Sequence, residues 1–550
     1  MSFYWLNTQS RNFLARGYLR NGQTAEDRIR EIADTAEKHL GISGFSDKFY
    51  EYMSRGYYSL ASPVWSNYGT DRGLPVSCFG SFVSDNMESI LYSHAENGML
   101  MKTGGGTSGF FGDLRHRGAR ITDNGESSGS VHFMEIFDKL ASIVSQGSVR
   151  RGFFSAYQSI EHADADEFLD IGTEGHPIQG LTTGITVSDA FLNRVTGGDS
   201  EARKLWAKVL QRRSEIGFPY ILFEDNVNNG RPDVYKDLKM QVWASNMCSE
   251  IALPSSEQET FTCVLSSINL LHWDEIVETD AIETLVYFLD TVVTEFIEKT
   301  EGRKYFERAN LFAKRHRALG MGVLGWHSYL QSNMIAFEGG DAAKKNLEIA
   351  KTLNKRAYAA SGELAKMFGE PELLTGYGRR NTTLLAIAPT KSSSFILGQV
   401  SQSIEPEFSN CYVKDLAKVK TTIKNPYLKK LLEEKGQDKS EIWESIKNMD
   451  GSVQHLDFLT QDEKEVFKTF SEINPYAIVD QAGIRQQYID QAQSLNLMLD
   501  PDTSVKDINS LYLHAWQIGV KSLYYSYSMS AAQSLTRKKV TSSDCAACEA

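Results

Sequence analysis

The chain of 550 residues has few cysteines and no long apolar run. Its six cysteines are too sparse for the disulfide framework of a small secreted protein, so we expect thiols in a reducing compartment. No apolar stretch of about 18 residues occurs, and the N-terminus lacks the charged and apolar segments of a secretory signal. The sequence therefore predicts a cytoplasmic protein with no membrane partner.

Positive charge is also scarce. The chain has 58 Lys and Arg against 70 Asp and Glu, which gives a net charge of −12 and no basic block. A nucleic acid polymer is therefore not an expected partner, and an anionic substrate would have to be bound by local donors. The length allows one large catalytic domain with appendages, or two to three domains.

Hydrophobic patterning indicates a mixed α/β protein. Residues 1–60 favour helices, and short apolar runs then alternate with glycine-rich turns and helical stretches. We expect a buried helix over 281–299 and a strand over 384–388 that ends at Pro389. Residues 415–470, rich in Lys, Glu and Asp, are typical of a solvated helical insertion. After Tyr527 the composition predicts a flexible tail.

The C-terminal tail carries a Cys-x-x-Cys pair, Cys545 and Cys548. A structural zinc site needs four ligands, and no second pair or histidine lies nearby in the sequence. A dithiol that exchanges with another disulfide fits better, because a tail offers exposure and reach. The alternative is two cysteines without a shared role.

Three further motifs are ambiguous on their own. The turn Pro389-Thr390-Lys391-Ser392-Ser393-Ser394 follows the apolar run and could bind phosphate, or simply cap a helix. The segment 103–109 is glycine-rich but lacks the spacing of a phosphate-binding loop, so close packing is the favoured role. The neighbours Tyr524 and Tyr525 would ordinarily be core or interface residues.

The segment Asn246-Met247-Cys248-Ser249-Glu250 is the main catalytic candidate. In an extended conformation, alternate residues face the same side, so an amide, a thiol and a carboxylate would converge. A thiol beside a potential base is a catalytic combination. The alternative is a buried cysteine among polar neighbours.

The run from Asn246 to Pro254 closely resembles the active-site motif of ribonucleotide reductase large subunits, and the resemblance extends from about residue 10 to the tail. It implies a ten-stranded α/β barrel of two five-stranded halves, with the catalytic cysteine on a loop through the centre. The expected domains are a helical region over 1–60, the barrel over 61–525 and a redox-active tail over 526–550.

The resemblance also implies roles for the polar residues of the motif. Cys248 would become a thiyl radical that abstracts the 3′-hydrogen of the ribose, Glu250 would act as the base, and Asn246 would hold the sugar. Cys78 and Cys263 match the two cysteines that reduce the 2′-carbon and end as a disulfide. Cys411 matches no such role and is expected to be structural.

Substrate and effector positions follow from the same resemblance. Substrate contacts are expected at Ser62, Ser77, Thr390, Ser392 and Ser393. Asp85, Lys102 and Arg115 match residues that bind a dNTP effector, and 123–129 resembles the first effector loop. Residues 146–152 resemble the second loop, in which Gln146, Arg150 and Arg151 would link the effector to the choice of substrate base. Such a family member is expected to be a homodimer.

The tyrosine pair indicates class I. Tyr524 and Tyr525 match the relay that carries a radical from a separate small (β) subunit with a diiron, dimanganese or Mn/Fe centre. No metal or other cofactor is then expected in this chain. Thioredoxin or glutaredoxin would recharge the Cys545–Cys548 pair.

Two alternatives remain: an adenosylcobalamin-dependent class II reductase and a catalytically silent nucleotide-binding homologue. Many relatives begin with a cone domain that binds ATP or dATP. Here the helical region starts almost at once, so we expect no cone and no general dATP off-switch.

Overall fold

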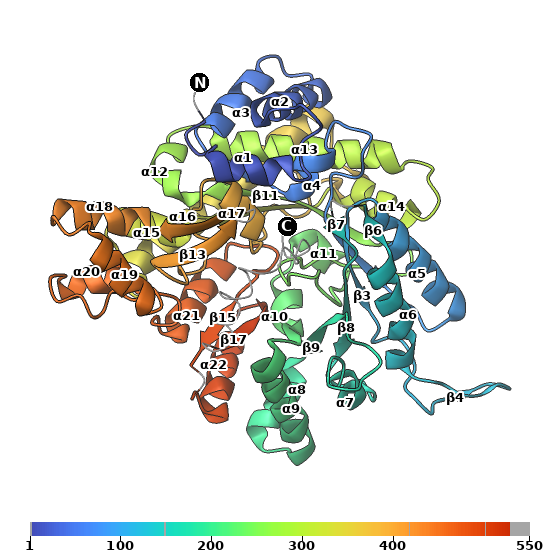
Figure 1. Cartoon of the computed structure of the whole chain (residues 1–550). Coiled ribbons are helices and arrows are strands. Elements are labelled where there is room, and N and C mark those ends of the chain that lie inside the picture. Colours follow the sequence, from blue (N-terminus) through green and yellow to red (C-terminus); the bar gives the residue numbers. More distant parts are fainter. Residues whose placement is uncertain (1–2, 148–149, 417–418, 501, 529–550) are drawn as a thin grey trace.

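The chain begins with a helical region that covers one end of the molecule (Figure 1). The computed structural model describes residues 3–147, 150–416, 419–500 and 502–528. The first helices are α1 (Thr8–Ala15), α2 (Ala25–Leu40) and α3 (Phe45–Ser54). Helix α2 opens with a capping box, in which Thr24 and Asp27 each accept a backbone N–H of the other. The helices expected before residue 60 are confirmed.

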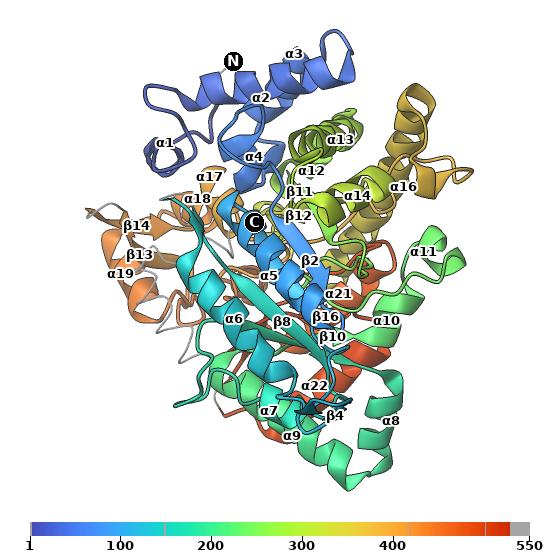
Figure 2. The ribbon, with the colours of Figure 1, turned by 90° about the vertical axis from the view of Figure 1, so that its right-hand side faces the viewer.

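Five parallel strands form one half of the main sheet, in the order β2, β3, β8, β9 and β10. They are β2 (Cys78–Phe82), β3 (Gly106–Phe110), β8 (Phe154–Ser159), β9 (Thr182–Val187) and β10 (Tyr220–Phe223). Parallel neighbours require crossover connections, and helices supply them along the outside of the sheet (Figure 2). These helices are α5 (Met87–Lys102), α6 (Ser130–Ile143), α7 (Ala165–Phe168), α8 (Asp189–Gly197) and α9 (Ser200–Ile216).

The second half of the sheet meets the first through antiparallel pairs at both ends. Strand β11 (Phe261–Asn269) pairs with β2, and β16 (Ser522–Leu523) pairs with β10. Strand β11 also pairs in parallel with β12 (Leu319–Leu324), and β1 (Tyr58–Leu60) pairs antiparallel with β11. Within the described residues, this sheet has nine assigned strands. Two opposed halves curled toward each other confirm the predicted α/β barrel fold.

The segment 384–388 extends the second half, but not as a continuous strand. It makes two isolated parallel bridges, Met321 to Leu385 and Ile387 to Gln493. The carboxylate of Asp490 accepts the N–H groups of Leu384 (2.7 Å) and Leu385 (2.9 Å), where a neighbouring strand would otherwise supply carbonyls. A side chain thus replaces part of the ladder, and the expectation of a regular strand is wrong.

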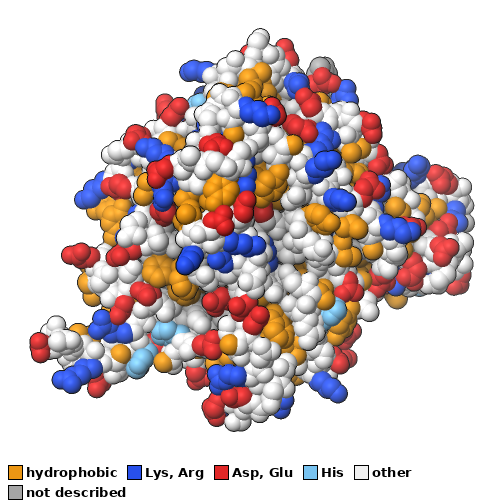
Figure 3. All heavy atoms as spheres, turned by 180° about the vertical axis from the view of Figure 1, so that it is seen from behind, with side chains coloured by type: hydrophobic (Ala, Val, Ile, Leu, Met, Phe, Trp, Pro, Cys, Tyr) orange, Lys and Arg blue, Asp and Glu red, His pale blue; other side chains and the backbone are white. Residues whose placement is uncertain are grey.

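Residues 411–470 form a lobe at one side of the molecule, and its surface is densely charged (Figures 1 and 3). It opens with a hairpin, β13 (Cys411–Leu416) and β14 (Val419–Lys424), followed by α18 (Pro426–Glu434), α19 (Ser440–Asn448) and α20 (Gln461–Val466). Leu428, Trp443 and Phe467 contribute to an apolar core of its own. The expected insertion is therefore helical only after residue 425; its charged residues lie on the solvated surface, and it also has a small apolar core.

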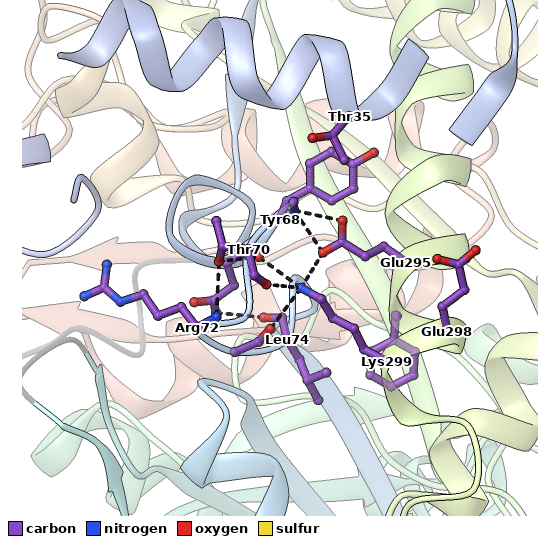
Figure 4. A network of polar contacts seen from close by, with 12 residues as sticks. Thr35, Tyr68, Thr70, Arg72, Leu74, Glu295, Glu298 and Lys299 are labelled. Atoms are coloured by element: carbon purple, nitrogen blue, oxygen red, sulfur yellow. Dashed lines mark hydrogen bonds and ion pairs between the residues drawn. The ribbon is translucent and has the colours of Figure 1, made fainter. Parts of the chain in front are cut away.

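Helix α13 (Ala281–Thr300) confirms the predicted buried helix. It packs against α2, against the long helix α16 (Gly340–Phe368) and against strand β11. Its last two turns carry Glu295 and Lys299, both of which face the loop between α4 (Ser62–Asn67) and β2 (Figure 4).

Candidate functional site

Two cysteines lie directly opposite each other on neighbouring strands. Cys78 opens β2 and Cys263 lies in β11, and the two residues are register partners of the antiparallel pair. Directly opposed residues of such a pair have Cα atoms about 4.5–5.5 Å apart, a separation that suits a disulfide. Both side chains are buried. The sequence prediction that these two cysteines work together therefore has a matching geometry.

The segment around Cys248 is a tight turn rather than an extended strand. The N–H of Ser249 donates to the carbonyl of Asn246 (3.3 Å), and Ser249 has a φ of 65°. The expectation that alternation along a strand brings Asn246, Cys248 and Glu250 together is therefore wrong. The turn itself, with a residue in the left-handed region, directs these side chains.

Both halves of the barrel hold this turn, so that it lies between them. From β8, the Tyr157 hydroxyl donates to the carbonyl of Asn246 (2.8 Å). From the opposite half, the Ser494 hydroxyl donates to the carbonyl of Cys248 (2.5 Å) and to Glu250 Oε2 (3.2 Å). Cys248 and Glu250 are almost completely buried.

An amide hydrogen bond reaches each of the paired cysteines. Asn246 Nδ2 donates to Cys78 Sγ (3.4 Å), and Gln491 Nε2 donates to Cys263 Sγ (3.3 Å). Burial raises the pKa of the Cys263 thiol well above its usual value, and the Gln491 hydrogen bond opposes that rise. Neither Gln491 nor Ser494 was found from the sequence, because polar residues such as Gln486, Gln487 and Gln493 occur throughout this segment and nothing distinguishes these two from them.

The hydroxyl-rich turn lies beside the start of helix α4. Helix α17 (Lys391–Ile396) packs on β1, where Ser59 Oγ donates to the carbonyl of Ser393 (2.9 Å). Thr390 precedes α17, but its side chain does not cap the helix: it has a φ of 53°, and its hydroxyl accepts the N–H of Ser403 (2.8 Å) instead. Ser392 Oγ is buried without a hydrogen-bond partner. The capping alternative is thus excluded for Thr390, and Ser392 offers a free hydroxyl.

The tyrosine pair belongs to the same apolar cluster as Cys248. The ring centroids of Tyr524 and Tyr525 are 4.5 Å apart, and Tyr220 packs against them at 4.7 and 5.1 Å. Tyr220 was not predicted from the sequence, because nothing in its neighbourhood marks it apart from other strand aromatics. A contiguous set of aromatic rings thus lies beside the buried thiol.

The three predicted effector residues do not meet within one chain. Arg115 Nε pairs with Asp85 Oδ2 at 2.7 Å near the start of α5. Lys102 is the last residue of α5. A helix of 16 residues is about 24 Å long, so Lys102 lies far from the other two.

The predicted loops are short hairpins. Strands β4 (Arg120–Ile121) and β5 (Gly125–Glu126) form the first, which projects from the molecule (Figure 1). Strands β6 (Ser145–Gln146) and β7 (Arg150–Arg151) form the second. Gln146 is buried and Arg151 exposed. The Arg150 side chain and the Cys545–Cys548 pair lie outside the described residues.

The glycine-rich segment 103–109 serves close packing, as predicted. A Cβ added to Gly105 would lie 2.6 Å from the ring of Phe79. Among the described residues, no group of three or more His, Cys, Asp or Glu side chains is arranged to hold a metal ion. In the same part of the chain, no helix is long and apolar enough to cross a membrane.

Two family models match the sequence. "Ribonucleotide reductase, all-alpha domain" matches residues 4–73, and "Ribonucleotide reductase, barrel domain" matches 76–201, 198–373 and 371–526. The chain belongs to the ribonucleotide reductase large-subunit family. Membership in this class I family implies a separate small subunit that supplies the radical.

Individual relatives agree with this assignment. The putative ribonucleoside-diphosphate reductase large subunit of Frog virus 3 is 35% identical over 511 residues, which cover 89% of each chain. The ribonucleoside-diphosphate reductase subunit alpha of Chlamydia pneumoniae is 30% identical and matches 88% of this chain but 54% of its own length. Among solved structures, the Actinobacillus ureae class Id ribonucleotide reductase alpha subunit is 56% identical, with a TM-score of 0.92 and coverage of 98% and 99%.

Proposed function

We propose that this chain is the catalytic subunit of a class I reductase that converts ribonucleoside diphosphates to 2′-deoxyribonucleotides for DNA synthesis. The observation that carries the proposal is the direct pairing of Cys78 with Cys263, next to the turn of Cys248. Reduction of one ribose consumes two electrons. Two opposed thiols that close to a disulfide supply them, while the third cysteine remains available for radical chemistry.

Each polar group near the thiols has a proposed part in that reaction. Cys248, as a thiyl radical, takes the 3′-hydrogen and returns it at the end of the cycle. Glu250 accepts the proton of the 3′-hydroxyl, and Asn246 hydrogen-bonds the sugar. The 2′-hydroxyl leaves as water and a hydrogen takes its place on the 2′-carbon, while Cys78 and Cys263 together provide two protons and two electrons and close to a disulfide. Exclusion of bulk water by the barrel protects the radical, and the near-complete burial of Cys248 suits this need.

The diphosphate would bind at the hydroxyl-rich turn. Ser392 has a buried hydroxyl without a partner, and such a group is costly unless a ligand satisfies it. Thr390, Ser393, Ser62 and Ser77 are the other proposed substrate contacts, and the packing of α17 on β1 brings the turn near the start of α4.

The radical and the reducing electrons would arrive from outside. Tyr525 and Tyr524 would relay the radical from the metal-containing small subunit, with diiron, dimanganese and Mn/Fe centres as candidates. The ring contacts support this route because short steps favour radical transfer. Cys545 and Cys548 would pass electrons from thioredoxin or glutaredoxin to the internal pair. Asp85, Lys102 and Arg115 would bind the dNTP effector of a cytoplasmic homodimer.

The test is reconstitution with the small subunit. A metalloprotein that co-purifies with this chain is added, and CDP reduction is followed by product chromatography. We expect turnover only with both chains present, and Cys248→Ser should lower it by at least about 10⁴-fold while dNTP binding persists. Turnover of the single chain with adenosylcobalamin would instead establish class II chemistry, and no turnover under either condition would support the silent homologue.

A further inference from the structure

Gln146 is a buried anchor at the base of an exposed hairpin. Its side chain belongs to β6, whereas Gly147 and Arg151 of the same hairpin are exposed. Gln146 Nε2 donates to Asn67 Oδ1 (3.1 Å). A Cβ added to Gly73 would lie 2.5 Å from Nε2, and one added to Gly104 would collide with Oε1. Two glycines thus leave a slot for this amide, which docks the hairpin onto the body of the protein.

Asn67 receives this amide and is held on its other sides. It is the last residue of α4 and is completely buried. Its Nδ2 donates to the carbonyl of Leu74 (2.8 Å), across the loop that leads to β2. The Asn67 side chain therefore uses its oxygen to bind the hairpin and its nitrogen to bind the loop, and these two hydrogen bonds fix its orientation.

The loop around Asn67 is braced by an ion pair on α13 (Figure 4). Lys299 Nζ donates to the carbonyls of Asn67 (3.1 Å), Thr70 (2.5 Å) and Gly73 (3.3 Å). Glu295 accepts the N–H of Gly69 with both oxygens, at 3.0 and 2.8 Å, and pairs with Lys299 at 2.5 Å. Because charged groups bind the backbone itself, the loop keeps one shape as long as this pair is intact.

The braced loop connects two parts of the proposed substrate site. Helix α4 begins at Ser62, and the loop ends shortly before Ser77 and Cys78. A shift at Asn67 is therefore transmitted to both ends along one short, rigid segment. When Gln146 is docked, its Oε1 atom is buried without a hydrogen bond. The docked state therefore carries the energetic cost of one unpaired acceptor. A ligand that offers this amide a better set of partners can release it.

We propose that Asn67 is a specificity-determining positioning residue, which couples the Gln146 hairpin to the substrate site through the loop braced by Glu295 and Lys299. This inference rests on the proposed function, in which the hairpin senses the dNTP effector. Docked and released Gln146 are the two states that effector and substrate both bias, as coupling between sites requires.

The test is a double-mutant cycle read out as substrate choice. Wild type, Asn67→Ala, Gln146→Ala and the double variant are each assembled with the small subunit. Equal concentrations of the four ribonucleoside diphosphates compete, with each dNTP in turn, and product ratios are measured. We expect each single variant to reduce the effector-induced change in product ratio by about fivefold or more. The double variant should lose no more of this effector-induced selectivity than either single variant does, because all three variants lack the same contact between Asn67 and Gln146.

Additive losses in the double variant would overturn the proposal, as would an unchanged selectivity in Asn67→Ala. The paired variant Glu295→Gln/Lys299→Met should reduce the same selectivity. Glu298→Gln, on the same helix but with a side chain 60% exposed, should leave it unchanged. If wild type itself shows no response to dNTPs, the proposed effector function fails instead, so the two failures are distinguishable. Thermal unfolding of every variant excludes loss of fold as the cause.

Discussion

The amide of Gln491 ties Cys263, one of the two proposed reducing thiols, to the rest of the barrel. Besides Cys263 Sγ, its Nε2 donates to the carbonyl of Leu319 (2.9 Å) and to Thr383 Oγ1 (3.1 Å). Its Oε1 accepts the N–H of Ala252 (3.1 Å), in the segment that follows the Cys248 turn. Gln491 thus fixes the position of Cys263 relative to that turn. Because it donates to the sulfur, it also favours the thiolate over the thiol.

Replacing Gln491 by Met should raise the pKa of Cys263 further. The variant loses the hydrogen bond that favours the thiolate, and burial then acts on the thiol unopposed by it. In single-turnover CDP reduction by the pre-reduced holoenzyme, the limb of the pH profile that depends on this thiol should move toward alkaline pH. Gln493→Met is the control, because Gln493 contacts the carbonyl of Ala482 rather than a thiol. An unmoved limb in Gln491→Met would contradict the role of the amide.

At the scale of single residues, the sequence could predict the cysteines but not Gln491. Cys78 and Cys263 were assigned because each lies in a recognisable motif. Gln491 is 228 residues away from Cys263 and lies in no motif with a known spacing. Only the path of the chain through the second half of the barrel brings the two side chains together, and no local pattern encodes that path.

At the scale of elements, helix α5 buries a carboxyl group against the start of β11. Glu96 is completely buried, and its Oε2 accepts the hydroxyl of Thr260 (2.9 Å). Its other oxygen, Oε1, has no hydrogen-bond partner. Burial raises the pKa of Glu96 to about 7, against an ordinary value of 4.5. Packing of α5 on the sheet is therefore strongest when this group carries its proton.

The folded protein should accordingly lose stability as the pH rises from about 4.5 to about 7. In this window the folded state binds the proton and the unfolded state has released it, so the free energy of unfolding falls by about 3 kcal/mol in total. Glu96→Gln cannot ionise and should abolish this part of the slope. Urea unfolding of both proteins at several pH values measures the difference between them.

The exposed Glu88, at the start of the same helix, provides the matched control. Glu88→Gln should retain the wild-type dependence of stability on pH. Parallel curves for wild type and Glu96→Gln would show that the buried carboxyl does not titrate in this window.

Two segments show why sequence patterns fail to predict local structure that depends on distant contacts. Residues 384–388 have the composition of a strand, yet Asp490 takes the place of part of its ladder. The Cys248 segment was expected to be extended, yet Ser249 adopts a φ of 65° and closes a turn. Helix α13, in contrast, has enough apolar length to be predicted without its neighbours. Strong periodicity over many residues is local information; a buried carboxylate or a strained turn depends on distant contacts.

At the scale of the whole molecule, the separation of Lys102 from Asp85 and Arg115 favours a two-fold dimer. If α5 packs antiparallel against its own copy, Lys102 approaches Asp85 of the partner subunit, and a nucleotide can contact all three side chains. Helix α5 carries two large apolar side chains on its exposed side, Met87 and Leu91, which are 55% and 56% exposed. They are four residues apart and hence lie on one face of the helix.

Leu91→Arg should therefore weaken both dimer formation and effector binding. Losing the burial of one leucine costs about 2 kcal/mol, so the dimer dissociation constant should rise by about 30-fold or more. Sedimentation equilibrium with and without dNTP gives the dimer constant, and equilibrium dialysis gives the affinity for dNTP. Because coupling is reciprocal, dNTP should tighten the wild-type dimer by the same factor by which dimer formation tightens dNTP binding.

Met367→Arg is the control for adding a charge, since Met367 is another exposed apolar side chain (45%), on α16. It should change neither constant. If Leu91→Arg left the dimer intact, α5 would not form the interface. If it abolished the dimer but left dNTP affinity unchanged, Lys102 would not share a nucleotide with Asp85 of the partner subunit, and each chain would have to bind its effector alone. If the effector joins two copies of the chain, Leu91→Arg should weaken dimer formation and dNTP binding together.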